Sequence, residues 1–262
     1  MTNALKKMAV EVFSSRAVLQ QLVRQQLILR YRRTALGYLW TLVNPLLMMS
    51  VMAVVFSTLF KADLKEFAIF LFAGMIPWSL FNSVSTQSSG AFVNNEGLIK
   101  KIYIPKIVFP LSIAVAVLID SILSFVALFL IIVAVGGTIS WAIVFLPVAY
   151  ILLFVFSIGF GLITSVLTVF FRDLQYVLII AMQGLFFLTP ILYKHDSLSG
   201  KVAWLVGLNP VVPFIELFRA PLYRAEFPAG GVVIQAVVIS FVTISIGLLY
   251  LIKQEKKIVF RL

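Results

Sequence analysis

The sequence predicts an all-α fold, a polytopic membrane protein with six transmembrane helices. Its composition supports this: 62% of the residues are hydrophobic, 12% are charged, and the mean hydropathy is +1.09. Soluble domains are usually about half apolar and about a quarter charged. A water-soluble core cannot take up this much apolar surface, so lipid must be the solvent for most of the chain. We expect a single membrane domain, residues 1–262, without an independent soluble domain.

The predicted spans follow from runs of apolar residues, because about twenty such residues cross the hydrocarbon core as a helix. No charged residue lies between Arg33 and Lys61, which defines the first span. Gly136 and Gly137 interrupt a longer apolar stretch, so the third and fourth spans must form a helical hairpin. The predicted spans are residues 38–60, 67–88, 107–135, 142–170, 174–193 and 232–252.

The basic residues predict the orientation. Lys and Arg gather in residues 1–33, 100–106 and 253–262, and fewer fall in the intervening loops. Positively charged loops stay on the cytoplasmic side of a membrane protein. Both termini are therefore expected in the cytoplasm. The same rule accounts for the net charge of +11 without a nucleic-acid partner.

Two cytoplasmic segments lie outside the predicted spans. Residues 1–33 place apolar residues at helical spacing with basic residues between them, which is typical of a helix lying in the membrane interface. Residues 96–103 read as a short helix, with Glu96 at its positive end and Asn94 or Asn95 as its cap. The tail, residues 253–262, completes the cytoplasmic side.

On the outer side, residues 197–223 are apolar but are broken by Pro210, Pro213 and Pro221. The segment is too interrupted to span, so we expect two short helices that re-enter or rest on the outer leaflet. Within it, Glu216 and Arg219 stand three residues apart and can pair on one helical face.

Several kinds of chemistry are missing from the sequence. It has no cysteine and one histidine, His195, so nothing indicates a disulfide or a metal site. It lacks the glycine-rich phosphate loop of nucleotide-hydrolysing proteins. Its acidic residues are scattered, and Asp120 is the one clear ionisable residue inside a span, whereas an ion-coupled carrier needs several. We expect neither an enzyme nor an ion-driven carrier, and no cofactor or metal in this chain.

Four local strings resemble one family, and they occur in the family's order and topological positions. They are RYRRTALGYLW (30–40), EGLIKKIYIPKIVFP (96–110), FFRDLQY (170–176) and LNPVVPFIELFRAPLY (208–223). With six spans and inside termini, the chain resembles the permeases of ABC exporters for O-antigen, capsule and teichoic acid polysaccharides.

The resemblance implies a bacterial inner-membrane homodimer bound to two copies of a cytoplasmic ATPase, which holds the ATP and Mg²⁺. The implied cargo is a lipid-linked polysaccharide, foremost an O-antigen on undecaprenyl diphosphate, which passes through a channel between the two permeases. The alternatives are a capsule or teichoic acid permease, a small-molecule or lipid ABC exporter, and a membrane enzyme of lipid-linked sugar assembly.

Two groups of cytoplasmic residues are candidates for binding. The guanidinium groups at the first span could hold a lipid diphosphate bidentately or only anchor the chain to anionic lipid; they belong to Arg30, Arg32 and Arg33. The short helix matches the family's coupling helix, which seats in the ATPase, although it could instead rest on lipid. The candidate coupling residues are Glu96, Leu98, Ile99, Lys100, Lys101, Ile102 and Tyr103.

Other candidates lie deeper in the membrane or on the outer side. Aromatic rings could line the channel and let sugar faces slide past, or simply pack; the candidates are Tyr38, Trp40, Phe186, Phe187 and Tyr193. Asp120 could act in gating, or could pair structurally with a hydroxyl or an arginine. The family's outer gate corresponds to Asn209, Pro210, Glu216 and Arg219, for which a solvated surface pair is the alternative.

Overall fold

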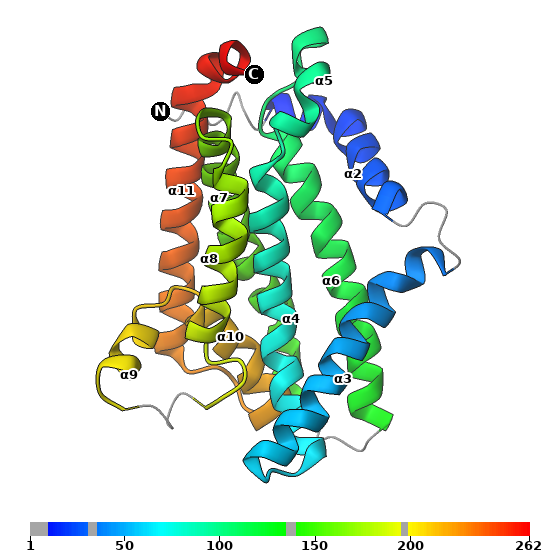
Figure 1. Ribbon diagram of the computed structural model, residues 1–262, viewed down its shortest axis with the longest axis vertical. Coiled ribbons are helices and arrows are strands. Elements are labelled where there is room, and N and C mark those ends of the chain that lie inside the picture. The colour runs from blue at the N-terminus through cyan, green and yellow to red at the C-terminus, as the bar shows by residue number, and fades with distance from the viewer. Residues whose placement is uncertain (1–9, 31–35, 135–139, 195–198) are drawn as a thin grey trace.

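The computed structural model describes residues 10–30, 36–134, 140–194 and 199–262, and all regular structure within them is helical. Most of the helices run along one axis (Figure 1). The short helix α5 (Glu96–Lys101) and the C-terminus lie at one end, called here the α5 end. α9 (Gly200–Gly207) and α10 (Val212–Arg219) lie toward the other, the α10 end.

Five of the described helices are long and apolar enough to cross a membrane. They agree with five predicted spans, which confirms a polytopic all-α membrane protein. The last of them runs to Arg261, beyond the predicted end at residue 252. The five are α3 (Trp40–Phe60), α4 (Leu64–Ser89), α6 (Val108–Ala134), α7 (Leu146–Phe170) after the 3₁₀ turn Trp141–Phe145, and α11 (Gly230–Arg261).

The predicted fifth span is shorter than expected. α8 (Leu174–Leu188) has 15 residues, which rise about 22 Å and fall short of a hydrocarbon core of about 30 Å. The helix ends because Thr189 precedes Pro190 and takes an extended conformation, φ −95° and ψ 129°. A continuous helix to Tyr193 is therefore a wrong prediction.

The two short helices predicted before the last span are confirmed as α9 and α10. α10 continues into a π-helical turn, Ala220–Arg224, and the bend between the two helices is 85°. This geometry is that of a broken span or a re-entrant loop.

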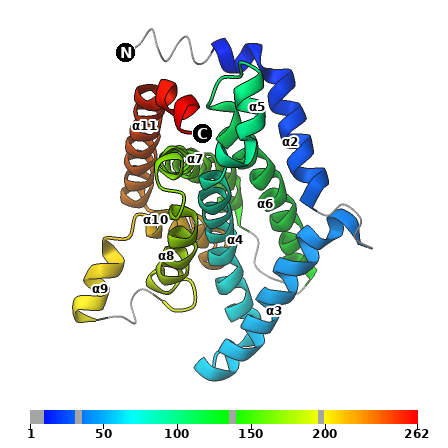
Figure 2. The same cartoon turned by 45° about the horizontal axis from the view of Figure 1, so that its top comes forward.

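On the flank opposite α11, α2 (Arg16–Arg30) packs against α6, and α3 begins below it (Figure 2). α2 lies within the predicted interfacial segment; residues 1–9 and 31–33 are outside the described residues. α5 ends earlier than predicted, since Ile102 is already extended. Capping by an asparagine is also wrong: Asn95 occupies the N-cap position but donates its Nδ2 to the Ala91 carbonyl, 2.8 Å away.

An aromatic stack joins α4, α7 and α10 in the core. The rings of Phe81 and Phe156 lie 4.9 Å apart, and those of Phe156 and Phe214 lie 4.6 Å apart, both nearly parallel. All three side chains are buried. α4 starts at Asp63, whose carboxylate accepts hydrogen bonds from the amides of Lys65 and Glu66 and so satisfies the first turn.

Small residues let α7 approach both neighbours at backbone distance. A Cβ added to Gly159 would lie 2.6 Å from the Ile244 amide nitrogen, and one added to Gly247 would lie 2.5 Å from the Gly159 carbonyl oxygen. On another face of α7, a Cβ at Gly161 would lie 3.0 Å from Ser88 of α4. α7 is thus clamped between α11 and α4.

We predict that Gly159→Ala destabilises the protein by about 1–3 kcal/mol, because the new methyl meets backbone that cannot move aside without shifting α11. The thermal unfolding midpoint in detergent measures the loss. Gly184→Ala in α8 is the matched control, since nothing lies within 4 Å of its added Cβ. Equal midpoints for the two variants would contradict the clamp.

Candidate functional site

One face of α4 carries polar side chains through the C-terminal half of the helix, toward the α5 end. They recur at positions i, i+3, i+4, i+7 and i+8, which is one helical face, and all are exposed or half-buried. The buried face of α4 is mostly apolar but includes the small polar residues Ser85 and Ser88, and it packs against α7. Polar groups in a span avoid lipid and face a cavity or a water-filled path. The α4 stripe consists of Ser79, Asn82, Ser83, Thr86 and Gln87.

A groove of about 500 Å³ runs between the α4 stripe and α8. The Trp78 and Phe186 rings lie 5.7 Å apart, and the Phe186 and Phe187 rings lie 5.4 Å apart, edge to face. Side-chain amides from both helices stand beside these rings. Such a surface suits a ligand with apolar faces and hydroxyl edges. The α4–α8 groove is lined by Trp78, Asn82, Thr86, Gln87, Ile179, Met182, Gln183, Phe186 and Phe187.

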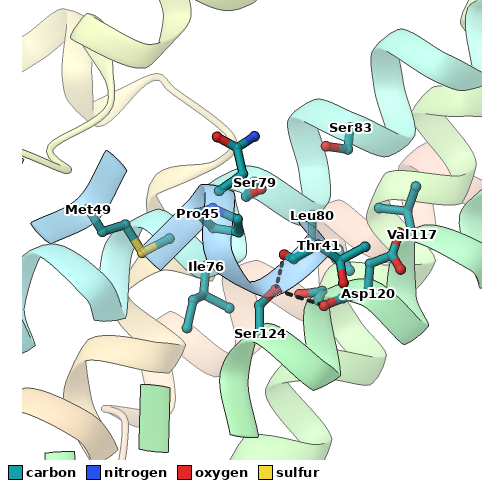
Figure 3. A pocket seen from close by; sticks show the side chains of 12 residues that line it. Thr41, Pro45, Met49, Ile76, Ser79, Leu80, Ser83, Val117, Asp120 and Ser124 are labelled. Carbon is teal, nitrogen blue, oxygen red and sulfur yellow. Dashed lines mark hydrogen bonds between the residues drawn. The ribbon is translucent and has the colours of Figure 1, made fainter. Parts of the chain in front are cut away.

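On the other side of the α4 stripe, a cavity of about 180 Å³ lies between α3, α4 and α6 (Figure 3). It has room for about six waters at about 30 Å³ each. Asp120 lies in its wall and is 9% exposed. The lining residues are Thr41, Asn44, Pro45, Met49, Ile76, Ser79, Leu80, Ser83, Val117, Asp120, Ser121 and Ser124.

The sequence explains part of this polar cavity. Pro45 has no N–H, so the Thr41 carbonyl loses its partner within α3. The Ser124 hydroxyl donates toward that carbonyl at 3.5 Å and to the Asp120 carbonyl at 2.9 Å (Figure 3). The buried hydroxyl of Ser121 has no hydrogen-bond partner within the described part of the chain. Asp120 therefore lies among hydroxyls at the first turn of α3, whose positive end favours a carboxylate.

At the α5 end, one buried side chain anchors α5 to the rest of the chain, and one ion pair lies within the helix. Ile99 is 4% exposed and packs inside the chain. The Lys100 ammonium lies 2.6 Å from the Glu96 carboxylate, and this hydrogen bond and charge lower the pKa of Glu96. Ile102 and Tyr103 are 57% and 73% exposed. The exposed apolar surface next to α5 thus comes from Ile102 and Tyr103, which directly follow the helix, while Ile99 anchors the helix.

At the α10 end, Arg219 is 2% exposed and packs over the Phe70 ring, with 3.9 Å from Cζ to the ring centroid. Its Nη2 donates to the Ile191 carbonyl at 2.9 Å. The Glu216 carboxylate is 3.8 Å from Arg219 and 2.8 Å from Arg224. Glu216 and Arg219 share a face as predicted, but Arg224 is the closer partner and Arg219 is not solvated.

Asn209 fixes the bend between α9 and α10. Its Nδ2 donates to the Thr189 hydroxyl at 2.8 Å, and its Oδ1 accepts from the Val211 amide at 2.9 Å. Pro210 beside it is exposed. The bend is thereby tied to the end of α8.

The structure brings together two of the predicted channel aromatics, Phe186 and Phe187. Trp40 starts α3 and does not line the groove, and Tyr193 lines a separate cavity at the α10 end. The side chains of the remaining predicted residues lie outside the described part: Arg30, Arg32, Arg33 and Tyr38.

The sequence reasoning missed Trp78, Asn82 and Gln183. The helical spacing of the polar residues in the second span was a readable signal for Asn82. Nothing in the sequence pairs that face with α8.

Comparison with known proteins places the chain in a family. The family model for the ABC-2 type transporter matches residues 17–223. The O-antigen export system permease protein RfbA of Myxococcus xanthus is 30% identical over 220 residues, covering 83% of this chain and 85% of that protein. RfbA of Klebsiella pneumoniae is 30% identical over 203 residues, covering 76% and 77%. The polysialic acid transport protein KpsM of Escherichia coli is 29% identical over 234 residues, covering 86% and 89%. The family model covers most of the chain, these relatives match it over most of their length, and the chain belongs to the ABC-2 type transporter family.

Proposed function

We propose that the chain is the permease subunit of an ATP-driven exporter that moves a lipid-linked polysaccharide, foremost an O-antigen on undecaprenyl diphosphate, across the bacterial inner membrane. The observation that carries this proposal is the α4 stripe with its aromatic and amide-lined groove. Relatives named for O-antigen export and polysialic acid transport support a polysaccharide cargo.

The α4–α8 groove has the chemistry that a sliding sugar chain needs. The exposed ring of Phe187 and the half-buried ring of Phe186, which packs on the buried Trp78, contact the apolar faces of sugars without fixing one register. The amides of Asn82 and Gln183 both donate and accept hydrogen bonds, so they can exchange partners with passing hydroxyls. A surface of this kind guides a polymer without holding one sugar tightly.

A second copy of the chain would complete the path. The α4 stripe is open to one side in a single chain, and lipid does not solvate its polar groups. α3, which lies beside the stripe, is itself only 17% buried over its span. If two copies met through α3 and the α4 stripe, the polar side chains of both copies would line an enclosed channel. This geometry favours a homodimer.

Energy for transport would come from a separate ATPase, present in two copies and holding ATP and Mg²⁺. α5 projects at the α5 end (Figure 1), where its lysines and the apolar side chains of Ile102 and Tyr103 directly after it are exposed, which suits docking into a protein groove. That end and both termini would then be cytoplasmic. Arg30, Arg32 and Arg33 remain candidates for holding the lipid diphosphate.

We predict that Asn82→Leu combined with Gln183→Leu lowers export about thirtyfold, because the two lost hydrogen bonds cost about 1 kcal/mol each, or about 2 kcal/mol together. Surface polysaccharide is quantified in a strain that carries the variant as its sole permease. Gln25→Leu on α2 is the matched amide control and should export normally. Full export by the double variant, at wild-type protein levels, would show that the polysaccharide does not pass along the α4–α8 groove.

We also predict that Ile102→Asp abolishes co-purification with the ATPase while the permease still inserts, because a charge then sits on the exposed apolar surface of α5. Phe227→Asp, equally exposed but at the other end of the molecule, is the control. A stable ATPase complex with Ile102→Asp would refute docking through α5. A wild-type chain that purifies without any ATPase would favour a membrane enzyme of lipid-linked sugar assembly.

A further inference from the structure

A cavity of about 530 Å³ at the α10 end carries an excess of positive charge. Three basic side chains and one carboxylate line it, together with two aromatic rings and one amide. Glu66 is a further carboxylate nearby, in the wall of the adjoining cavity. The lining residues are Phe70, Lys194, Gly207, Val212, Pro213, Glu216, Arg219, Tyr223, Arg224, Val232 and Gln235.

The charge of Arg219 is poorly compensated within this cavity. The side chain is 2% exposed, and the carboxylate of Glu216 lies 3.8 Å away. That carboxylate is held more closely by Arg224, at 2.8 Å. The Nε of Arg219 has no hydrogen-bond partner among the residues that the structure describes. A buried cation without a well-placed counter-charge is costly, so the cavity favours an anion.

The surroundings hold Arg219 in place for such a role. The Phe70 ring supports the guanidinium from one side, and Nη2 is fixed on the Ile191 carbonyl. Gly74 leaves room on α4, since a Cβ there would lie 3.1 Å from Nη2. The donor is thus preorganised, which lowers the cost of binding.

The remaining basic groups are reachable from solvent. The Arg224 side chain is 43% exposed, and Lys194 is exposed with its ammonium 5.8 Å from the Tyr223 ring centroid. The Tyr223 ring in turn meets Phe70 edge to face at 5.3 Å. A ligand that carries an anionic group on a ring would contact the positive charges of Arg224 and Lys194 and the apolar rings of Tyr223 and Phe70.

We propose that this cavity is a binding site for an anionic oxygen group, a carboxylate or a phosphate. Arg224 and Arg219 donate hydrogen bonds to it, and Lys194 adds positive charge. The anion has two possible sources, an acidic sugar of the exported chain or the headgroup of a membrane lipid. The site itself stands on the electrostatics of the cavity; only the first of these sources rests on the proposed function.

The test uses the full chain in phosphatidylcholine nanodiscs and isothermal titration calorimetry. Methyl β-D-glucuronide and inorganic phosphate should bind at least about tenfold more tightly than neutral methyl β-D-glucoside, with affinity falling as salt rises. Phosphatidylglycerol added to the nanodiscs separates the sources. Competition by this lipid assigns the site to a headgroup, and undiminished glucuronide binding assigns it to an acidic sugar.

Variants locate the binding. Arg224→Gln should weaken glucuronide binding about tenfold through loss of a charge-assisted hydrogen bond. Glu216→Gln should strengthen it, because the competing carboxylate is removed. Lys201→Gln on α9 removes an exposed basic group outside the cavity and should leave the affinity unchanged.

Glucuronide and phosphate that bind no better than the glucoside would overturn the proposal, as would equal affinities for Arg224→Gln and wild type. Arg224→Gln and Glu216→Gln both replace partly exposed residues, so both variants should fold. The thermal unfolding midpoint checks this before binding is measured. Binding is measured without transport, so a negative result leaves the export function standing, and failure of export leaves the anion site standing.

Discussion

The packing of α4 against α7 is the constraint on which the functional surfaces depend. Gly161 allows close approach to Ser88, and the Phe81–Phe156 stack fills the space next to it. Because the buried face of α4, with its large apolar side chains and small serines, packs on α7, the α4 stripe points the other way. The contact of α7 with α11 at Gly159 and Gly247 makes α7 a fixed support, so the polar surface rests on a rigid wall.

α4 also connects the two ends of the molecule. At the α5 end it leads through the turn Val93–Asn95 directly into α5, so a partner that moves α5 acts on α4. At the α10 end, Phe70 and Gly74 form the seat of Arg219. A shift of α4 would therefore change both the width of the α4–α8 groove and the support of Arg219, so α4 couples the α5 end mechanically to the α10 end.

The charged side chains at the two ends of the molecule differ in their exposure to solvent. The Glu96–Lys100 pair of α5 is exposed, and such pairs contribute little to stability and are open to a partner. Arg219 is buried, and its position is determined by a ring, a carbonyl and a distant carboxylate. In the middle, Asp120 is surrounded by hydroxyls contributed by three helices. The buried charged residues Asp120 and Arg219 are thus accommodated by tertiary neighbours.

The membrane class, five of the spans and the two short helices before the last span could be predicted from the sequence, because hydropathy and proline act locally along the chain. The sequence also contained the spacing of the α4 stripe. It failed at the end of α8, where Pro190 outweighed an apolar run, and at α5, where the Asn95 side chain found a carbonyl one turn earlier. The helix packing alone places Asn82 and Gln183 in the wall of one groove and Arg219 between Phe70 and Ile191. These contacts join residues that are far apart in the sequence. They form only when the helices pack together, and that packing depends on the shapes of all neighbouring helices.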